Sequence, residues 1–147
     1  MNSVEKKEKT IEAVMVFVMN KNKQILLLKR LDNSRWEPIK GGINIGESFD
    51  AAIIRELKEE ANIILESKPI LLGIVDDVLD TSEGKSTKIH GHVVLAIVDG
   101  VQNITLGSGE HEEHSEYRWV NMNLVEAEDL YPSIANKMIK IINENQK

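Results

Sequence analysis

The segment from Gly41 to Ile63 reads GGINIGESFDAAIIRELKEEANI and is the most informative stretch of the chain. It opens as a glycine-rich loop. Beyond Ser48, apolar side chains recur at the spacing of a single helical stripe, at Phe49, Ala52, Ile53 and Leu57. This periodicity predicts a helix that begins near Ser48 and ends near Asn62.

The predicted helix carries three carboxylates on one side. At about 100° per residue, Glu59 and Glu60 lie about 60° and about 40° to either side of Glu56. Like charges crowded in this way repel one another unless a cation lies among them. Because no His or Cys is nearby, the cluster favours a hard cation, Mg²⁺ or its substitute Mn²⁺, over zinc. Arg55, four residues before Glu59, is placed to hold that carboxylate.

The loop in front of the helix suits a phosphate ligand. Gly41 and Gly42 allow a close approach of the backbone, and free N–H groups at a helix start attract anions. An acidic helix face on its own is most often solvated surface. The occurrence of the loop, the arginine and the three carboxylates in one segment instead favours a site for a metal and a phosphate.

The same segment resembles the Nudix box, G-x5-E-x7-R-E-U-x-E-E-x-G-U, where U is a bulky aliphatic residue. The departure is Asn62, where the family usually has Gly. That position resembles a helix C-cap with positive φ, which Asn tolerates better than other non-glycine residues. The matching positions are Gly41, Glu47, Arg55, Glu56, Leu57, Glu59, Glu60 and Ile63.

Outside the box, the resemblance extends to Trp36 and to the Glu-rich run before Trp119. It implies an α/β (α+β) fold, a Nudix-like α/β/α sandwich with a mixed β-sheet. The implied reaction is Mg²⁺-dependent cleavage of a pyrophosphate bond in a nucleoside diphosphate linked to another moiety, with a nucleoside triphosphate or dinucleoside polyphosphate as substrate. A catalytically inactive Nudix-like binding or scaffold module is the alternative. Such modules usually lose a box carboxylate, and this chain retains them.

The resemblance also implies roles for individual residues. Glu47 is expected to hold the loop and helix together through hydrogen bonds, whereas Gly41 and Gly42 contact the substrate. The implied catalytic residues are Glu56, Arg55 and Glu113. The implied metal ligands are the main-chain carbonyl of Lys40 and the carboxylates of Glu56, Glu59, Glu60 and Glu113.

Glu113 is chosen from the four glutamates of the loop before Trp119, where the family often has a carboxylate that takes a proton from water or completes the metal site. It directly precedes His114 and the predicted strand, so its backbone is better fixed than that of Glu112. Glu116 is expected to pair across the sheet, and Glu110 to be solvated. If the whole loop is mobile, the base must lie among the box glutamates.

The rest of the chain is predicted to form one domain over residues 10–147 after a polar tail over 1–9. Extended segments are followed by a closing helix with an apolar side. The first two strands flank the turn-forming residues 20–23 and are expected to form a hairpin. The predicted strands cover 11–19, 24–29, 36–40, 69–78, 88–98 and 117–120, and the closing helix covers 132–145.

Composition limits the possible functions of the 147 residues. The chain has no cysteine, which excludes disulfides and thiolate metal sites. Its net charge of −6 disfavours a stable DNA or RNA complex and favours a small-molecule nucleotide substrate. Neither a signal peptide nor a membrane span is apparent, so a cytoplasmic location is expected. A homodimer is compatible with the sequence.

Two histidine patterns suggest metal sites of other kinds. The run from His111 to His114 is not an H-E-x-x-H zinc motif, because Ser115 stands where the second histidine is needed. His90 and His92 would share one face of a strand. The sequence shows no third ligand for them, so a structural role is favoured.

Few aromatic side chains are available to grip a nucleobase. Tyr117 and Trp119 alternate on one strand face, which favours places in the core. The sequence does not rank the candidates for base binding, which are Phe17, Trp36, Tyr117 and Tyr131.

Overall fold

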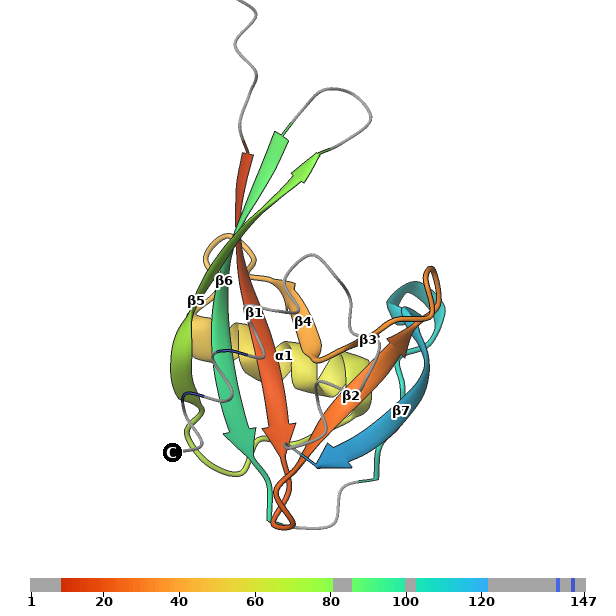
Figure 1. The fold of residues 1–147 in the computed structure, drawn as a ribbon. Coiled ribbons are helices and arrows are strands. Elements are labelled where there is room, and N and C mark those ends of the chain that lie inside the picture. Colours follow the sequence, from red (N-terminus) through yellow and green to blue (C-terminus); the bar gives the residue numbers. More distant parts are fainter. Residues whose placement is uncertain (1–8, 81–85, 100–102, 122–139, 141–143, 145–147) are drawn as a thin grey trace, which may run out of the picture.

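The computed structural model describes residues 9–80, 86–99 and 103–121, together with Lys140 and Glu144. Within these residues, a seven-stranded mixed sheet is packed against one α-helix (Figure 1). This agrees with the predicted α+β class. Apart from Lys140 and Glu144, the closing helix predicted over 132–145 falls outside the described residues, as does nearly all of the polar tail.

The strands agree with the extended segments predicted from the sequence and extend several of them. A 3₁₀ turn, η1 (Gly109–His111), precedes the last strand. The helix is α1 (Phe49–Ala61). The strands are β1 (Lys9–Met19), β2 (Gln24–Arg30), β3 (Trp36–Glu37), β4 (Ile39–Gly42), β5 (Ile70–Asp80), β6 (Ser86–Ile97) and β7 (His114–Asn121).

The predicted hairpin exists only at its turn. Strands β1 and β2 pair at Met19 and Ile25 and then diverge, as Figure 1 shows. Beyond that point β1 pairs in parallel with β6 along its whole length and antiparallel with β4 on its other side. Strand β2 pairs with β3 and β7 instead. The divergence leaves β4, which leads into the glycine-rich loop, between the two halves of the sheet.

Both faces of the sheet are buried along β1, which explains why its sequence is apolar without alternation. On one face, Val14 and Val16 of β1 pack against Ile53 and Leu57 of α1 in one core cluster. The opposite face buries a second cluster that includes Met15, Phe17, Ile25, Leu27 and Val93. The helix is thus fixed on one face of the sheet, with its polar side turned toward β4.

Two further features bear on the predictions. Trp119 packs against the core beneath α1, as predicted, but Tyr117 is 46% exposed, so its predicted place in the core is wrong. Both residues lie on β7, an outer strand that pairs with β2, but only Trp119 packs against the core cluster, whereas Tyr117, two residues nearer the start of the strand, does not. Among the described residues, no helix has the length and apolar character needed to cross a membrane.

Candidate active site

The helix that carries the box carboxylates has defined caps at both ends. At its start, Ser48 Oγ accepts a hydrogen bond from the backbone N–H of Ala51 at 3.1 Å. At its end, Asn62 has φ 56° and ψ 40°, and its N–H donates to the carbonyls of Leu57 and Lys58. The predicted boundaries and the left-handed cap are both confirmed.

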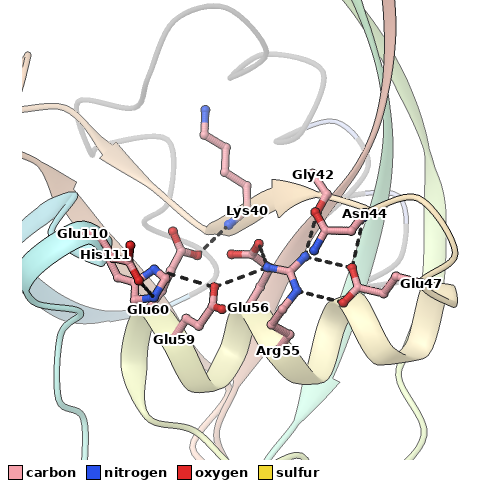
Figure 2. A network of polar contacts seen from close by, with 10 residues as sticks. All are labelled: Lys40, Gly42, Asn44, Glu47, Arg55, Glu56, Glu59, Glu60, Glu110 and His111. Atoms are coloured by element: carbon pink, nitrogen blue, oxygen red, sulfur yellow. Dashed lines mark hydrogen bonds and ion pairs between the residues drawn. The ribbon is translucent and has the colours of Figure 1, made fainter.

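Arg55 joins the glycine-rich loop to the helix (Figure 2). Its guanidinium donates to both carboxylate oxygens of Glu47, at 2.8 and 2.9 Å, and to the carbonyl of Gly42 at 2.8 Å. It also reaches Glu56 Oε1 at 2.6 Å and Glu59 Oε2 at 3.3 Å. The predicted contact between Arg55 and Glu59 is confirmed, and so is the bridging position of Glu47.

The electrostatics of Glu47 follow from this contact. The hydrogen bonds from Arg55, assisted by one from the Asn44 N–H at 3.1 Å, lower the pKa of Glu47 to about 2. In return, the hydrogen bonds to Glu47 and Glu56 and the charges of these carboxylates raise the pKa of Arg55 above its ordinary value. Glu47 is therefore an ionised carboxylate with its charge already balanced within the protein.

The pKa values of the two buried carboxylates of the helix shift in the opposite direction to that of Glu47. Glu56 and Glu60 are 7% and 4% exposed, and burial raises the pKa of each. For Glu60, burial together with the charges of Glu56 and Glu113 raises the pKa to about 10. One oxygen of Glu60 accepts from the Lys40 N–H at 3.2 Å, and the other is buried with no donor among the described residues.

The backbone at the start of the box packs directly on these carboxylates. A Cβ atom at Gly41 would lie 2.1 Å from Glu56 Oε1, so only glycine leaves room for the Glu56 side chain. The Lys40 ammonium points away from the carboxylates and forms an ion pair with Glu37 at 3.3 Å (Figure 2). Packing against Glu56 thus explains why a glycine is needed at position 41. Contact of Gly41 and Gly42 with substrate stays a prediction.

The loop that precedes β7 is hydrogen-bonded to the end of α1. The N–H groups of Thr105 and Gly107 donate to the carbonyls of Ala61 and Glu60 at 3.1 and 3.2 Å. A Cβ atom at Gly107 would lie 2.4 Å from the carbonyl oxygen of His111 and 2.8 Å from that of Glu59. This close contact places the loop before β7 against the carboxylate end of the helix.

The loop brings Glu113 and His114 to Glu60. One ligand atom from each of these three side chains lies within 4.8 Å of the others. The Glu113 carbonyl accepts from the Leu31 N–H at 3.0 Å, which fixes the backbone there. Glu113, the loop glutamate favoured from sequence, therefore faces the box carboxylates, although its catalytic or ligand role stays a prediction.

A buried cluster of charged side chains around Glu37 supports the start of β7, next to Glu113. The sequence analysis did not predict this cluster. His114 Nε2 contacts Glu37 Oε2 at 2.7 Å, and both side chains are almost fully buried. Burial opposes ionisation of Glu37, but the hydrogen bond with His114 and the charges of Lys40 and Arg30 outweigh it and lower its pKa. The only sequence signal was a glutamate between Trp36 and Pro38 in a predicted extended segment.

The other loop glutamates lie as expected. Glu116 forms an ion pair with Lys29 at 3.3 Å across the β2–β7 pair, as predicted. Glu110 is largely exposed and lies 3.5 Å from His111. Glu112 is also exposed, and it caps the 3₁₀ turn through its backbone N–H.

The donor set suits a hard divalent cation. Glu56, Glu59, Glu60 and Glu113 supply carboxylate oxygens, the ligands that Mg²⁺ and Mn²⁺ prefer. The unsatisfied oxygen of Glu60 and the raised pKa values of two neighbouring carboxyls mark a place where negative charge lacks a counter-charge. A cation at this position would supply it.

Comparison with known proteins establishes the family. The chain belongs to the Nudix family of pyrophosphohydrolases, since the NUDIX domain family matches residues 9–141. A relative described as RNA pyrophosphohydrolase from Wolbachia sp. subsp. Brugia malayi is 31% identical over 83% of this chain and 82% of its own length. A second RNA pyrophosphohydrolase, from Acinetobacter baylyi, is 36% identical over 74% of this chain and 71% of its own.

Solved structures share the fold. The MutT protein from Methanosarcina mazei has a TM-score of 0.77 at 25% identity and covers 96% of this chain and 99% of its own. The NUDIX domain of Shewanella oneidensis NrtR, solved with ADP ribose, has a TM-score of 0.74 at 15% identity, covering 99% and 94%. The family, fold class and enzyme class predicted from the sequence are thus confirmed.

Proposed function

We propose that the chain is a Mg²⁺- or Mn²⁺-dependent pyrophosphohydrolase of nucleoside 5′-polyphosphates, built as one Nudix domain over residues 10–147. The observation that carries the proposal is the buried oxygen of Glu60, for which the described part of the chain offers no donor and which lies beside Glu56 and Glu113. Glu56, Glu59, Glu60 and the Lys40 carbonyl would hold the cation. When bound, a cation neutralises phosphate charge and acidifies water.

The protein's own residues then have distinct tasks. Arg55 fixes the direction of Glu56 and Glu59 through the contacts described above. Glu113 is exposed and faces Glu60, so its carboxylate is placed to accept a proton from an attacking water. The buried pair of His114 and Glu37 holds the strand start next to Glu113. With a bound cation, these residues would supply a positioned metal site and a base for hydrolysis of a phosphoanhydride bond.

The 5′-triphosphate end of RNA is the substrate we propose to test first. Both relatives reported above are described as RNA pyrophosphohydrolases, and they match most of this chain. The net charge of −6 is unsuited to gripping a long RNA backbone. Contact restricted to the terminal nucleotide and its phosphates is compatible with that charge, because the cation would offset the phosphate repulsion.

Tyr117 is the side chain we propose for stacking on the first nucleobase. Of the four aromatic candidates, Phe17 and Trp36 are buried and Tyr131 lies outside the described residues. Tyr117 is 46% exposed. The β2–β7 register shifts between Lys29 and Arg30, and this bulge places His114 and Tyr117 on the same face of β7. Tyr117 therefore lies on the face that carries the site.

The test is a substrate panel with identified products. RNA bearing a 5′-triphosphate, free nucleoside triphosphates and dinucleoside polyphosphates would be incubated with Mg²⁺. We expect phosphate or pyrophosphate release to be fastest from 5′-triphosphate RNA and to stop in excess chelator. Faster hydrolysis of a free nucleotide would contradict the RNA assignment alone.

Variants separate the parts of the proposal. Tyr117→Ala should raise KM about tenfold with little change in kcat, because base stacking is worth about 1–3 kcal/mol. Tyr117→Phe keeps the ring and should retain the parent KM. Absence of hydrolysis across the whole panel, together with nucleotide binding by calorimetry, would instead support the inactive binding module.

A further inference from the structure

A second polar cluster lies on the same face of the sheet as α1, near the start of β1 and β6. It contains Glu12 from β1, His90 and His92 from β6, and Asp76 from β5. In the strand register Glu12 and Asp76 are the two partners of His90, so all three side chains share one face. Pairing of β1 with β6 thus supplies the third ligand that the sequence did not reveal for the histidines.

The distances within this cluster suit metal ligation. His92 Nε2 lies 3.0 Å from Glu12 Oε2. One ligand atom from each of Glu12, His90 and His92 lies within 4.8 Å of the other two. Ligands about 2 Å from a tetrahedral ion are a little over 3 Å apart, so only small side-chain movements would be needed.

Asp76 sets the orientation of one of the imidazoles. Its Oδ1 lies 2.6 Å from His90 Nδ1. An ionised carboxylate only accepts hydrogen bonds, so this contact favours the tautomer with the proton on Nδ1, in which Nε2 keeps its lone pair for a metal. A carboxylate that holds a histidine in this tautomer is a common support of metal-binding histidines.

The geometry points to a site for a borderline transition-metal cation of the Zn²⁺ class, bound by Glu12, His90 and His92, with Asp76 positioning His90. Two imidazole nitrogens and one carboxylate oxygen are a ligand set that zinc accepts, with a fourth position left to solvent. The side chains of His90 and His92 are 37% and 22% exposed, so an ion can reach them.

This site is separate from the carboxylate of Glu60, at which the proposed function places a cation. His92 packs edge-on against Phe49, the first residue of α1, with the ring centroids 5.3 Å apart. Glu60 lies near the other end of the helix, about 16 Å away at 1.5 Å per residue. The donor chemistry also differs, because Mg²⁺ prefers the oxygen-only site and zinc prefers the site with imidazoles.

A bound ion would join three strands. Glu12, His90 and His92, with Asp76 behind them, connect β1, β6 and β5, which lie side by side in Figure 1. A cation that binds only the folded state raises its stability by mass action. The expected consequence is a rise in Tm of several degrees with Zn²⁺, in addition to any effect of Mg²⁺.

The test is a titration of the full chain with Zn²⁺ by calorimetry in excess Mg²⁺, repeated with Co²⁺ to record the visible absorption of the bound ion. We expect one equivalent to bind and the Co²⁺ bands to indicate nitrogen ligands. His92→Asn and Glu12→Gln should abolish this binding, and Asp76→Asn should weaken it about 10- to 100-fold. Tm measured without added metal shows that each variant is folded.

His111→Asn is the matched control, because His111 is an exposed histidine near the box carboxylates. It should bind Zn²⁺ like the parent. Binding that persists in His92→Asn but falls in His111→Asn or Glu60→Gln would overturn the assignment, as would a parent protein that takes up no Zn²⁺. Neither result depends on hydrolytic activity, so failure here is distinguishable from failure of the proposed function.

Discussion

The box glutamates Glu47, Glu56, Glu59 and Glu60 form a row of carboxylates beside Arg55 (Figure 2). Glu47 and Glu60 are the two ends of this row, and their pKa values shift in opposite directions. Glu47 receives two hydrogen bonds from Arg55 and one from the Asn44 N–H, and its pKa falls to about 2. Glu60 is buried, one of its oxygens has no donor within residues 9–80, 86–99 and 103–121, and its pKa rises to about 10. Both are glutamates of the same box, so the difference comes from their surroundings.

The comparison distinguishes structural carboxylates from those that await a counter-charge. Arg55 supplies the positive charge at the Glu47 end, and this fixes the loop on the helix. Near Glu60 the neighbouring charges are those of Glu56 and Glu113, which repel it. Under the proposed function, a cation would supply the counter-charge at the Glu60 end, which lies beyond the contacts of Arg55.

The largest expected effect is on activity at the Glu60 end. Glu60→Gln and Glu56→Gln should each lower kcat by about 1000-fold, because a ligand of the cation is lost. The Tm of the metal-free protein should not fall in either variant, since burial and the neighbouring carboxylates oppose ionisation at both positions and Gln carries no charge. Steady-state kinetics and thermal unfolding check both statements.

Glu110→Gln is the comparison variant for this experiment, because Glu110 is largely exposed and its ion pair is with His111 and not with Arg55. Its kcat should match the parent. Full activity of Glu60→Gln, or hydrolysis that persists in excess chelator, would show that the buried end of the row does not hold the cation.

A second experiment asks which loop glutamate completes the Glu60 end. Glu113→Gln should lose about 100-fold in kcat and flatten the acidic limb of the pH–rate profile, because a general base must be ionised. Glu112→Gln removes the neighbouring exposed carboxylate and should behave like the parent. A loss of kcat in Glu112→Gln but not in Glu113→Gln would assign the base to Glu112. Parent behaviour in both variants would place it among the box glutamates.

At the other end, Glu47→Gln tests whether the carboxylate is structural. The pKa of Glu47 is lower in the folded state than its ordinary 4.5, so its stabilising effect is fully present above that pH and is lost as the pH falls toward about 2. The variant should therefore be less stable than the parent at neutral pH and should lose less stability on acidification. Denaturant unfolding at several pH values measures this difference.

Glu47→Gln should also lower kcat, but only about tenfold, because it acts through Arg55 rather than on the cation. Glu110→Gln again serves as the control for removing one negative charge. A loss in kcat as large as that of Glu60→Gln would mean that Glu47 also acts directly on the cation, and would contradict a structural role for Glu47.

The smallest expected effect is at the helix cap between the row and the following loop. Asn62→Gly should be neutral or mildly stabilising, because Asn62 has φ 56° and glycine adopts this conformation without strain. Asn62→Val should cost about 1 kcal/mol or more of unfolding free energy. Equal stability of the Val and Asn proteins by chemical denaturation would contradict the observed cap.

Local features of the site could be predicted because they depend on residues close in sequence. Ser48 and Asn62 cap their own helix, and the three box glutamates share an arc because the helix repeats every 3.6 residues. The contact between Arg55 and Glu59 follows from the same repeat. The interpretation of Glu116 as a cross-strand partner also needed only the strand alternation.

The sequence by itself therefore determined the helix, its caps, the row of carboxylates and the family. The tertiary structure decided which carboxylate is buried, that Glu37 and His114 meet across 77 positions, and that Glu12 stands beside His92 across 80. It also showed that β1 leaves β2 after one pair to join β6. The physical reason is that helix periodicity and capping act over a few residues, whereas burial and strand pairing depend on segments that approach only when the chain folds.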